Sequence, residues 1–177
     1  MSEFGTPGSG SGTEADEPRG DTSEEKQAWS AVLEDVQTIA SQLEADGWTA
    51  VTTPAGDTAP EPADAGPSDR FGFVHVVPGD DAGRIRELLD GAEITEFNVY
   101  SRTVGETFFF VTELRAPEQK TAVLVAGAYD VGEVRPLYET ARERGCVYTH
   151  LQKLDGTHVA SVRHDDFEKL FPDSLRE

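Results

Sequence analysis

Cysteine is nearly absent from this sequence of 177 residues, in which Cys146 is the single example. One thiol cannot form an internal disulfide, and it cannot build a zinc site from several cysteines. Long apolar runs are absent too: no stretch reaches the roughly 20 residues that a membrane span needs, or the shorter core of a signal peptide. We therefore expect a cytoplasmic protein that does not bind a membrane.

Basic residues are scarce, and lysine is the scarcer of the two. Lys and Arg total 15 against 34 Asp and Glu, which gives a net charge of −19, and only four of the 15 are lysines. At about 1 M salt the Debye length is roughly 3 Å, so repulsion among surface carboxylates is screened. Carboxylates also improve solubility more than Lys or Arg do. The composition indicates a surface adapted to concentrated salt, and it argues against binding to nucleic acid, which needs a basic patch.

The alternative interpretation is an acidic protein of dilute solution, such as a nucleic-acid mimic or a disordered solubiliser. A disordered acidic tail would concentrate its charge in one block. Here Asp and Glu are spread along the whole chain, including the segments with regular hydrophobic spacing. This distribution favours adaptation to salt.

Adaptation to salt predicts that the thermal stability of the protein rises markedly from low salt to molar potassium chloride. In dilute buffer the surplus carboxylates repel one another and destabilise the compact state, whereas molar salt screens them. The measurement is the melting temperature across a potassium chloride series. Equal stability in dilute buffer would contradict the salt interpretation.

The chain divides into a tail and one domain. Residues 1–22 are rich in Gly, Ser, Thr, Pro and acid, which is typical of a disordered acidic tail. Residues 23–177 are expected to form a single α+β domain. Apolar residues at helical spacing predict an amphipathic helix from Ser23 to Asp46. Four prolines among residues 53–70 predict a long loop rich in Pro, Ala and Asp.

The remainder of the domain repeats itself. Residues 72–115 and residues 121–163 each predict a buried strand, a helix and then two further strands. The helix starts match over eight positions, Asp81 to Leu88 against Asp130 to Leu137, with Asp, Gly, a β-branched residue, Arg and Leu at identical spacing. We interpret this pattern as a duplicated βαββ unit.

These elements together predict the fold class. We expect an α+β fold in which the two βαββ units form one mainly antiparallel sheet of six or seven strands, with helices packed on one face. The N-terminal amphipathic helix precedes this sheet. In the second unit Asp155-Gly156 is a strong signal for a two-residue hairpin turn. That turn would place His150 opposite Ser161, and Tyr148 opposite Arg163.

Strand alternation sorts the side chains of the two hairpins into an apolar face and a mixed face. The six residues that we select as candidate ligand-binding residues lie on the mixed faces: Tyr100, Arg102, Glu113, Tyr148, His150 and Arg163. If both units join one sheet, these side chains share one surface. That surface is open to three interpretations: a plain solvated sheet face, a partner or homodimer interface, or a small-molecule site.

Motifs for established chemistry are missing. No two histidines have the spacing of a helical zinc site, and His75, inside an apolar strand, is more typical of a satisfied core histidine. Cys146 has no basic neighbour in sequence to activate it as a nucleophile. Serine-nucleophile elbows, phosphate-binding glycine loops and dinucleotide fingerprints are also missing. We therefore predict no catalytic residue, no metal site and no cofactor, and regard an enzyme built on Tyr148, His150 and Glu113 as an alternative.

The sequence resembles an uncharacterised, acidic haloarchaeal family of unknown function. The resemblance rests on four segments: Asp46-Gly47-Trp48, Gly56-Asp57-Thr58-Ala59-Pro60, Asp69-Arg70-Phe71-Gly72 and Val77-Pro78-Gly79-Asp80. In element order alone, the duplicated unit is similar to the effector-binding domains of bacterial multidrug-response regulators and to SOUL-type haem-binding proteins. That similarity implies a ligand groove between the two halves with a buried glutamate, for which Glu113 would be the candidate.

These observations favour a non-enzymatic module that binds a small molecule or a protein through the mixed faces. An enzyme that uses the same Tyr, His and Glu side chains is one alternative. A structural domain that associates with itself is another.

Overall fold

The computed structural model describes residues 23–63 and 71–176, so the expected disordered tail 1–22 and part of the expected loop 53–70 lie outside the described residues. Within these ranges the three α-helices are α1 (Ser23–Ala45), α2 (Gly79–Leu89) and α3 (Arg135–Arg144). The same ranges contain eight strands: β1 (Thr49–Pro54), β2 (Asp57–Glu61), β3 (Gly72–Val76), β4 (Glu96–Val104), β5 (Thr107–Ala116), β6 (Thr121–Asp130), β7 (Val147–Gln152) and β8 (His158–His164). The fold is therefore α+β, which confirms the predicted class.

The described strands form two four-stranded sheets, so the expectation of one sheet with six or seven strands was wrong. Sheet A has the order β1-β6-β5-β4, and sheet B has the order β2-β3-β7-β8. Within them β1 runs parallel to β6 and β3 runs parallel to β7, while the other neighbours are antiparallel. Each of α2 and α3 carries the chain from one sheet to the other. Local sequence patterns do not encode that exchange.

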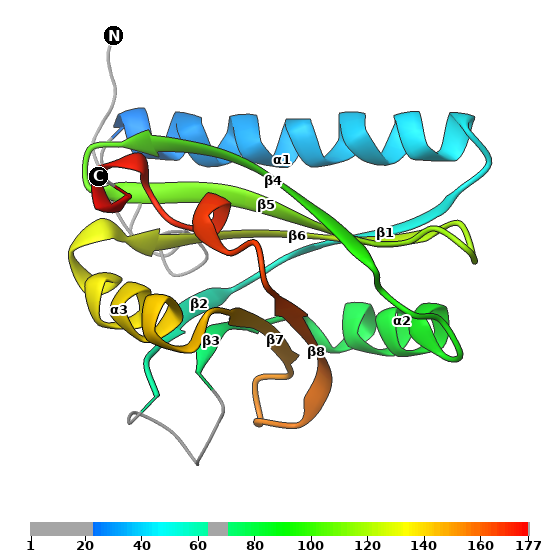
Figure 1. Cartoon of the computed structure of the whole chain (residues 1–177). Coiled ribbons are helices and arrows are strands. Elements are labelled where there is room, and N and C mark those ends of the chain that lie inside the picture. Colours follow the sequence, from blue (N-terminus) through cyan, green and yellow to red (C-terminus); the bar gives the residue numbers. More distant parts are fainter. Residues whose placement is uncertain (1–22, 64–70, 177) are drawn as a thin grey trace, which may run out of the picture.

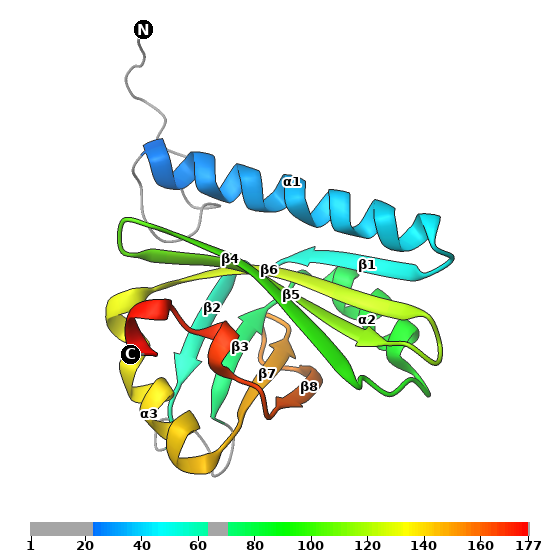
Figure 2. The same cartoon turned by 45° about the horizontal axis from the view of Figure 1, so that its top comes forward.

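The helices also occupy three places rather than one face of a sheet, which corrects that part of the prediction. Figures 1 and 2 show α1 along the outer face of sheet A, with sheet B on the opposite side of that sheet. Helices α2 and α3 lie at opposite ends of the molecule (Figure 1). The buried side chains of α2 belong to one core cluster between the sheets, and those of α3 belong to another.

Helix α1 follows the predicted amphipathic pattern closely. Its buried stripe is Ala28, Val32, Val36, Ala40 and Leu43. Most of this stripe packs on Phe109, Val111 and Leu124 of the outer face of sheet A. Burying an aliphatic or aromatic side chain of this size contributes about 1.5–3 kcal/mol. Packing against the sheet therefore holds the helix in place.

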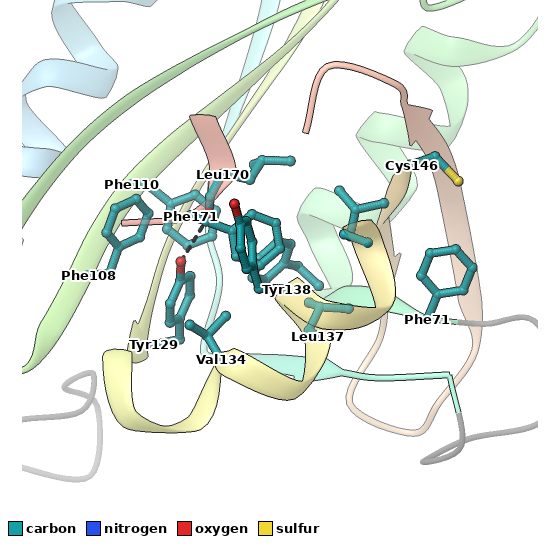
Figure 3. Packing of buried hydrophobic residues seen from close by; sticks show 13 residues of the cluster. Phe71, Phe108, Phe110, Tyr129, Val134, Leu137, Tyr138, Cys146, Leu170 and Phe171 are labelled. Carbon is teal, nitrogen blue, oxygen red and sulfur yellow. Dashed lines mark hydrogen bonds between the residues drawn. The ribbon is translucent and has the colours of Figure 1, made fainter. Parts of the chain in front are cut away.

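An aromatic cluster fills the space between the sheets on the α3 side (Figure 3). The ring of Phe73 stacks on that of Tyr129 with centroids 5.3 Å apart and also contacts the ring of Phe110. The buried Tyr129 hydroxyl donates a hydrogen bond of 2.8 Å to the Leu170 carbonyl. The C-terminal segment is thereby fixed into the core, with Phe171 packed against Phe73. Rings from both sheets and from the C-terminus make one continuous apolar layer.

The predicted loop 53–70 contains regular structure where it is described. Strand β1 extends as far as Pro54, and β2 (Asp57–Glu61) pairs antiparallel with β3. The expectation of an irregular segment was therefore wrong for these residues. Pro60 is tolerated in β2 because β2 is the edge strand of sheet B, where a missing amide proton need not break a ladder. Residues 64–70 lie outside the described residues.

The two predicted repeats show the same order of elements but pair differently. The first strand of the second unit, β6, pairs antiparallel with β5 of the first unit, whereas the first strand of the first unit, β3, pairs in parallel with β7 of the second unit. The two units therefore do not form one sheet across a pseudo-twofold axis. The duplication itself stays a prediction from the matching sequence segments.

Candidate functional site

The mixed face of the first hairpin is an ion-pair network beside α1. Glu113 is only 1% exposed and accepts hydrogen bonds from Asn98 Nδ2 (3.1 Å), Tyr100 Oη (3.1 Å) and Arg115 (3.3 Å). Partial burial and the Glu113 carboxylate raise the pKa of Tyr100, so its hydroxyl stays protonated and continues to donate. Arg102 forms an ion pair of 3.1 Å with Asp35 of α1. These contacts pair most polar groups of this face with one another.

The mixed face of the second hairpin has the predicted register. Tyr148 lies opposite Arg163, and His150 lies opposite Ser161. His150 is nevertheless buried: its Nδ1 lies 2.7 Å from Ser161 Oγ, and its Nε2 lies 3.3 Å from the Phe71 carbonyl oxygen. The Tyr148 ring stacks on the His150 ring at a centroid distance of 5.6 Å.

The structure does not bring the two mixed faces together, which corrects the expectation of one shared surface. Glu113 alternates along β5 with residues of the inter-sheet core, so it faces away from sheet B. His150 alternates along β7 with Val147 and Leu151 of the same core, so it faces away from sheet A. The two faces point in opposite directions. Tyr148 and His150 therefore do not share a site with Glu113.

Two histidines lie within the core between the sheets. His75 is fully buried, and a hydrogen bond of 2.8 Å joins its Nδ1 to Thr58 Oγ1. Gly127 leaves the space for this pair, since a β-carbon there would lie 2.6 Å from Thr58 Oγ1 and 3.0 Å from His75 Cε1. Burial, and then the charges of His150 and His164, lower the pKa of His75 to about 3. The ring is neutral near pH 7, as expected of a core histidine.

His164 has a similar environment. Its Nε2 lies 2.7 Å from Thr149 Oγ1, and its ring packs on Phe97 with centroids 4.1 Å apart. Burial, and then the nearby Lys169 charge, lower its pKa to about 4. The second ring nitrogen of His75 and that of His164 are buried with no hydrogen-bond partner among the described residues.

A groove elsewhere on the molecule is the best candidate for a functional site. It encloses about 890 Å³ and is lined from four separate segments of the chain. These are Trp29 and Leu33 of α1, residues 54–57 between β1 and β2, residues 76–79 between β3 and α2, and residues 153–155 in the β7–β8 turn. None of the six predicted ligand-binding residues lines it.

The lining of the groove is mostly apolar, with charge at few points. Trp29, Leu33 and Val77 contribute apolar surface, and Leu154 stands at the wall with 88% of its surface exposed. The charged side chains in the lining are Asp57, Lys153 and Asp155. The Asp155 carboxylate accepts a hydrogen bond of 2.9 Å from the Thr157 amide. Hydrogen bonds from Thr157 lower the pKa of Asp155, so this carboxylate is ionised near pH 7.

A smaller hollow adjoins the groove beside α1. It encloses about 260 Å³, and Leu33 and Pro54 line both it and the groove. The other residues that line the hollow are Val36, Gln37, Thr52, Thr53 and Ala126. The buried Thr53 hydroxyl already donates a hydrogen bond of 2.8 Å to Asp81. The hollow therefore offers mainly apolar contacts.

Sequence reasoning missed the groove because each of its segments looks unremarkable alone. The available signals were the turn residues Gly56, Gly79 and Asp155-Gly156, and the odd position of Trp29 at the edge of the apolar stripe of α1. None of these signals shows that the turns meet. Only the pairing of β1 with β6 and of β3 with β7 brings them together.

The described residues also bear on metal, thiol and membrane sites. Residues 23–63 and 71–176 contain no group of three or more His, Cys, Asp or Glu side chains placed to hold a metal ion. Cys146 is buried beside Val147 in the aromatic cluster. None of the described helices is long and apolar enough to cross a membrane.

Comparison with known proteins identifies a family. The sequence model of a family of unknown function (DUF7529) matches residues 15–172, which is most of the chain, and the chain belongs to that family. The curated proteins and the solved structures contain no match to it. Membership of an uncharacterised family is thereby confirmed. The haloarchaeal source and the likeness to effector-binding and SOUL-type domains stay predictions.

Proposed function

We propose that this member of the family of unknown function is a non-enzymatic module that binds a small organic molecule in the groove between α1 and the turns. The groove itself is the observation that carries the proposal. Its volume of about 890 Å³ falls in the range of roughly 300–1,000 Å³ typical of small-molecule sites. Its largely apolar lining with a few polar groups is also typical of such sites.

The charges in and around the groove favour a cationic ligand over an anionic one. Two carboxylates, Asp57 and Asp155, line it against the single ammonium group of Lys153. The whole chain carries a net charge of −19, which repels anions at long range in dilute solution. The indole of Trp29 adds an aromatic face that can attract a cation.

The composition supports a setting of concentrated salt, and we infer a haloarchaeal cytoplasm as the working environment. In about 1 M salt the Debye length is roughly 3 Å, so only a charge in direct contact with Asp57 or Asp155 would be attracted. Most of the binding energy would then come from burying apolar surface, at about 25 cal/mol per Å². The apolar lining of the groove suits that requirement.

Filling the groove should abolish binding without unfolding the protein. Gly79 lines the groove, and a β-carbon there would meet nothing within 4 Å. In Gly79→Phe the phenyl ring would occupy ligand space, so we expect the affinity for the cationic dye rhodamine 6G to fall at least tenfold, or about 1.4 kcal/mol. Fluorescence titration of the full chain in molar potassium chloride measures the affinity.

Gly83→Phe provides the matched control. Gly83 lies one turn further along α2, has equally open space at its β-carbon and does not line the groove. This variant should bind the dye as the unmodified chain does. Equal losses in both variants, or no saturable binding by the unmodified chain, would contradict the proposed function.

A further inference from the structure

We propose that the ligand is an elongated amphiphile, with an unbranched aliphatic chain that passes Leu33 into the smaller hollow and a cationic head group at Asp57 and Asp155. This inference rests on the proposed function, because it names the ligand class of the same groove. The smaller hollow is its main support. The groove alone would suit a compact ligand of many shapes, whereas the groove and the hollow together form an extended path.

Two residues mark the place where the two spaces adjoin. Leu33 of α1 and Pro54 at the end of β1 line both spaces, so the two spaces meet at these side chains. An extended chain of methylene groups can lie between two such side chains. A slender, flexible ligand therefore suits these two side chains.

The smaller hollow suits the end of an apolar chain and little else. Its volume of about 260 Å³ lies below the range of complete small-molecule sites. Val36 and Ala126 are buried side chains of its lining, and the Thr53 hydroxyl already has Asp81 as its acceptor. A polar group placed there would lose its hydration, and only the side chains of Gln37 and Thr52 in the lining could partner it in return. A terminal alkyl segment has no polar hydration to lose.

The opposite wall of the groove provides the polar end. Leu33 belongs to α1 on the outer face of sheet A, whereas Asp155 belongs to the β7–β8 turn of sheet B. Asp57, at the start of β2, also belongs to sheet B. Both carboxylates therefore lie in the layer away from α1. A molecule with its chain under α1 would place its head group near them, and a positive charge there would meet two negative ones.

A series of n-alkyltrimethylammonium ions from eight to fourteen carbons tests the chain-length dependence. Their affinities for the full chain are measured by displacement of Nile red in molar potassium chloride, below micelle formation. For the unmodified chain we expect a gain of about fourfold for each added methylene, equivalent to about 0.8 kcal/mol, until the hollow is full. Carboxylates with matching alkyl chains should bind at least tenfold more weakly.

Leu33→Trp should shorten the chain that the protein accepts. The indole would block the junction, so we expect the gain in affinity from octyl to longer chains to disappear. Ala126→Val, which narrows the hollow from β6 without lining the groove, should shift the same limit in the same direction. Glu34→Trp is the matched control, because Glu34 is exposed and lines neither space, and it should leave the series unchanged.

The outcomes separate this inference from the proposed function. If Leu33→Trp and Ala126→Val keep the chain-length dependence of the unmodified protein, the aliphatic chain does not use the hollow and the inference is overturned. Equal binding of the carboxylates would overturn the cationic head group. In both cases rhodamine 6G would still bind, and the proposed function would stand. Loss of all dye binding in Gly79→Phe combined with an unchanged alkyl series would place the amphiphile elsewhere and overturn the inference as well.

Discussion

Replacing Gly72 with alanine is expected to cost about 3 kcal/mol or more of unfolding free energy. Gly72 begins β3 with φ at +142°, a conformation that residues with a β-carbon rarely adopt. A β-carbon there would lie 2.2 Å from the Tyr148 carbonyl oxygen and 2.8 Å from its carbon. Those atoms belong to the backbone of β7, so relief requires separating two paired strands. Clashes of this kind belong to the small class of severely destabilising substitutions.

Gly91→Ala is the control for this prediction. Gly91 also has a positive φ, +78°, but a β-carbon there would meet nothing within 4 Å. Its substitution should therefore cost only the free energy of holding a residue with a β-carbon at positive φ, about 1 kcal/mol. Denaturant unfolding of both variants in molar potassium chloride gives the two values. Equal losses would show that the backbone of β3 does not approach Tyr148 as closely as described.

The difference between Gly72 and Gly91 shows which parts of this fold could be predicted from the sequence and which could not. Local elements were predictable because they depend on neighbours in the chain. The stripe of α1 and the strands of both hairpins follow from spacing. The pairing of His150 with Ser161 matches the register counted from a two-residue turn, although the structure reaches it through a longer turn and a register shift between Leu151 and Gln152. The close approach of Gly72 to Tyr148 depends on a parallel pairing between segments some 75 residues apart, which no local pattern encodes.

The placement of the predicted site failed for a related reason. Alternation correctly separated the two faces of each hairpin, and it identified Glu113 and Tyr100 as neighbours. It could not tell which face would be covered by α1: Phe109 and Val111 share the mixed face with Glu113 and are buried there against α1. The apolar character of those two residues was the available signal. A strand that is apolar on both faces indicates burial on both, as in the middle layer of three.

No such signal in the sequence marks the groove, because the groove is an assembly of turns. Pro54, Gly56 and Gly79 predict breaks in regular structure, and Leu154 is an exposed residue beside a hairpin turn. Their meeting depends on two parallel strand pairs and on the position of α1, which are properties of the whole fold. The resemblance to an uncharacterised family included the segments around Gly56 and Gly79. It brought no activity with it.

Acidification should destabilise the protein through its two core histidines. Protonation of the surface carboxylates has the opposite effect on stability. His75 and His164 have folded-state pKa values of about 3 and about 4, against 6.5 for an unfolded histidine. The folded protein therefore binds fewer protons than the unfolded chain between about pH 6.5 and those values. Stability is fully present above pH 6.5 and is lost as the pH falls toward the folded pKa values. We expect each histidine to account for about 2 kcal/mol between pH 7 and pH 5.

Substitution of each histidine by an uncharged amide isolates this contribution. In His75→Asn the amide can replace Nδ1 as the partner of Thr58, and in His164→Gln it can replace Nε2 as the partner of Thr149. Each variant should be less stable than the unmodified chain at pH 7, because the ring packing is reduced. Each should also lose less stability on acidification, by about 2 kcal/mol between pH 7 and pH 5. Unfolding free energies across that range provide the measurement.

The salt concentration decides whether the histidine effect can be seen. Protonation of surface carboxylates makes the net charge of −19 less negative and relieves repulsion. In dilute buffer acidification would therefore stabilise the protein and mask the effect of the histidines. In molar potassium chloride the repulsion is already screened, and the core histidines should dominate. His158→Asn, at an exposed position of β8, provides the same kind of substitution outside the core. If His75→Asn and His164→Gln follow the same pH dependence as the unmodified chain, the two rings are not held neutral in the core.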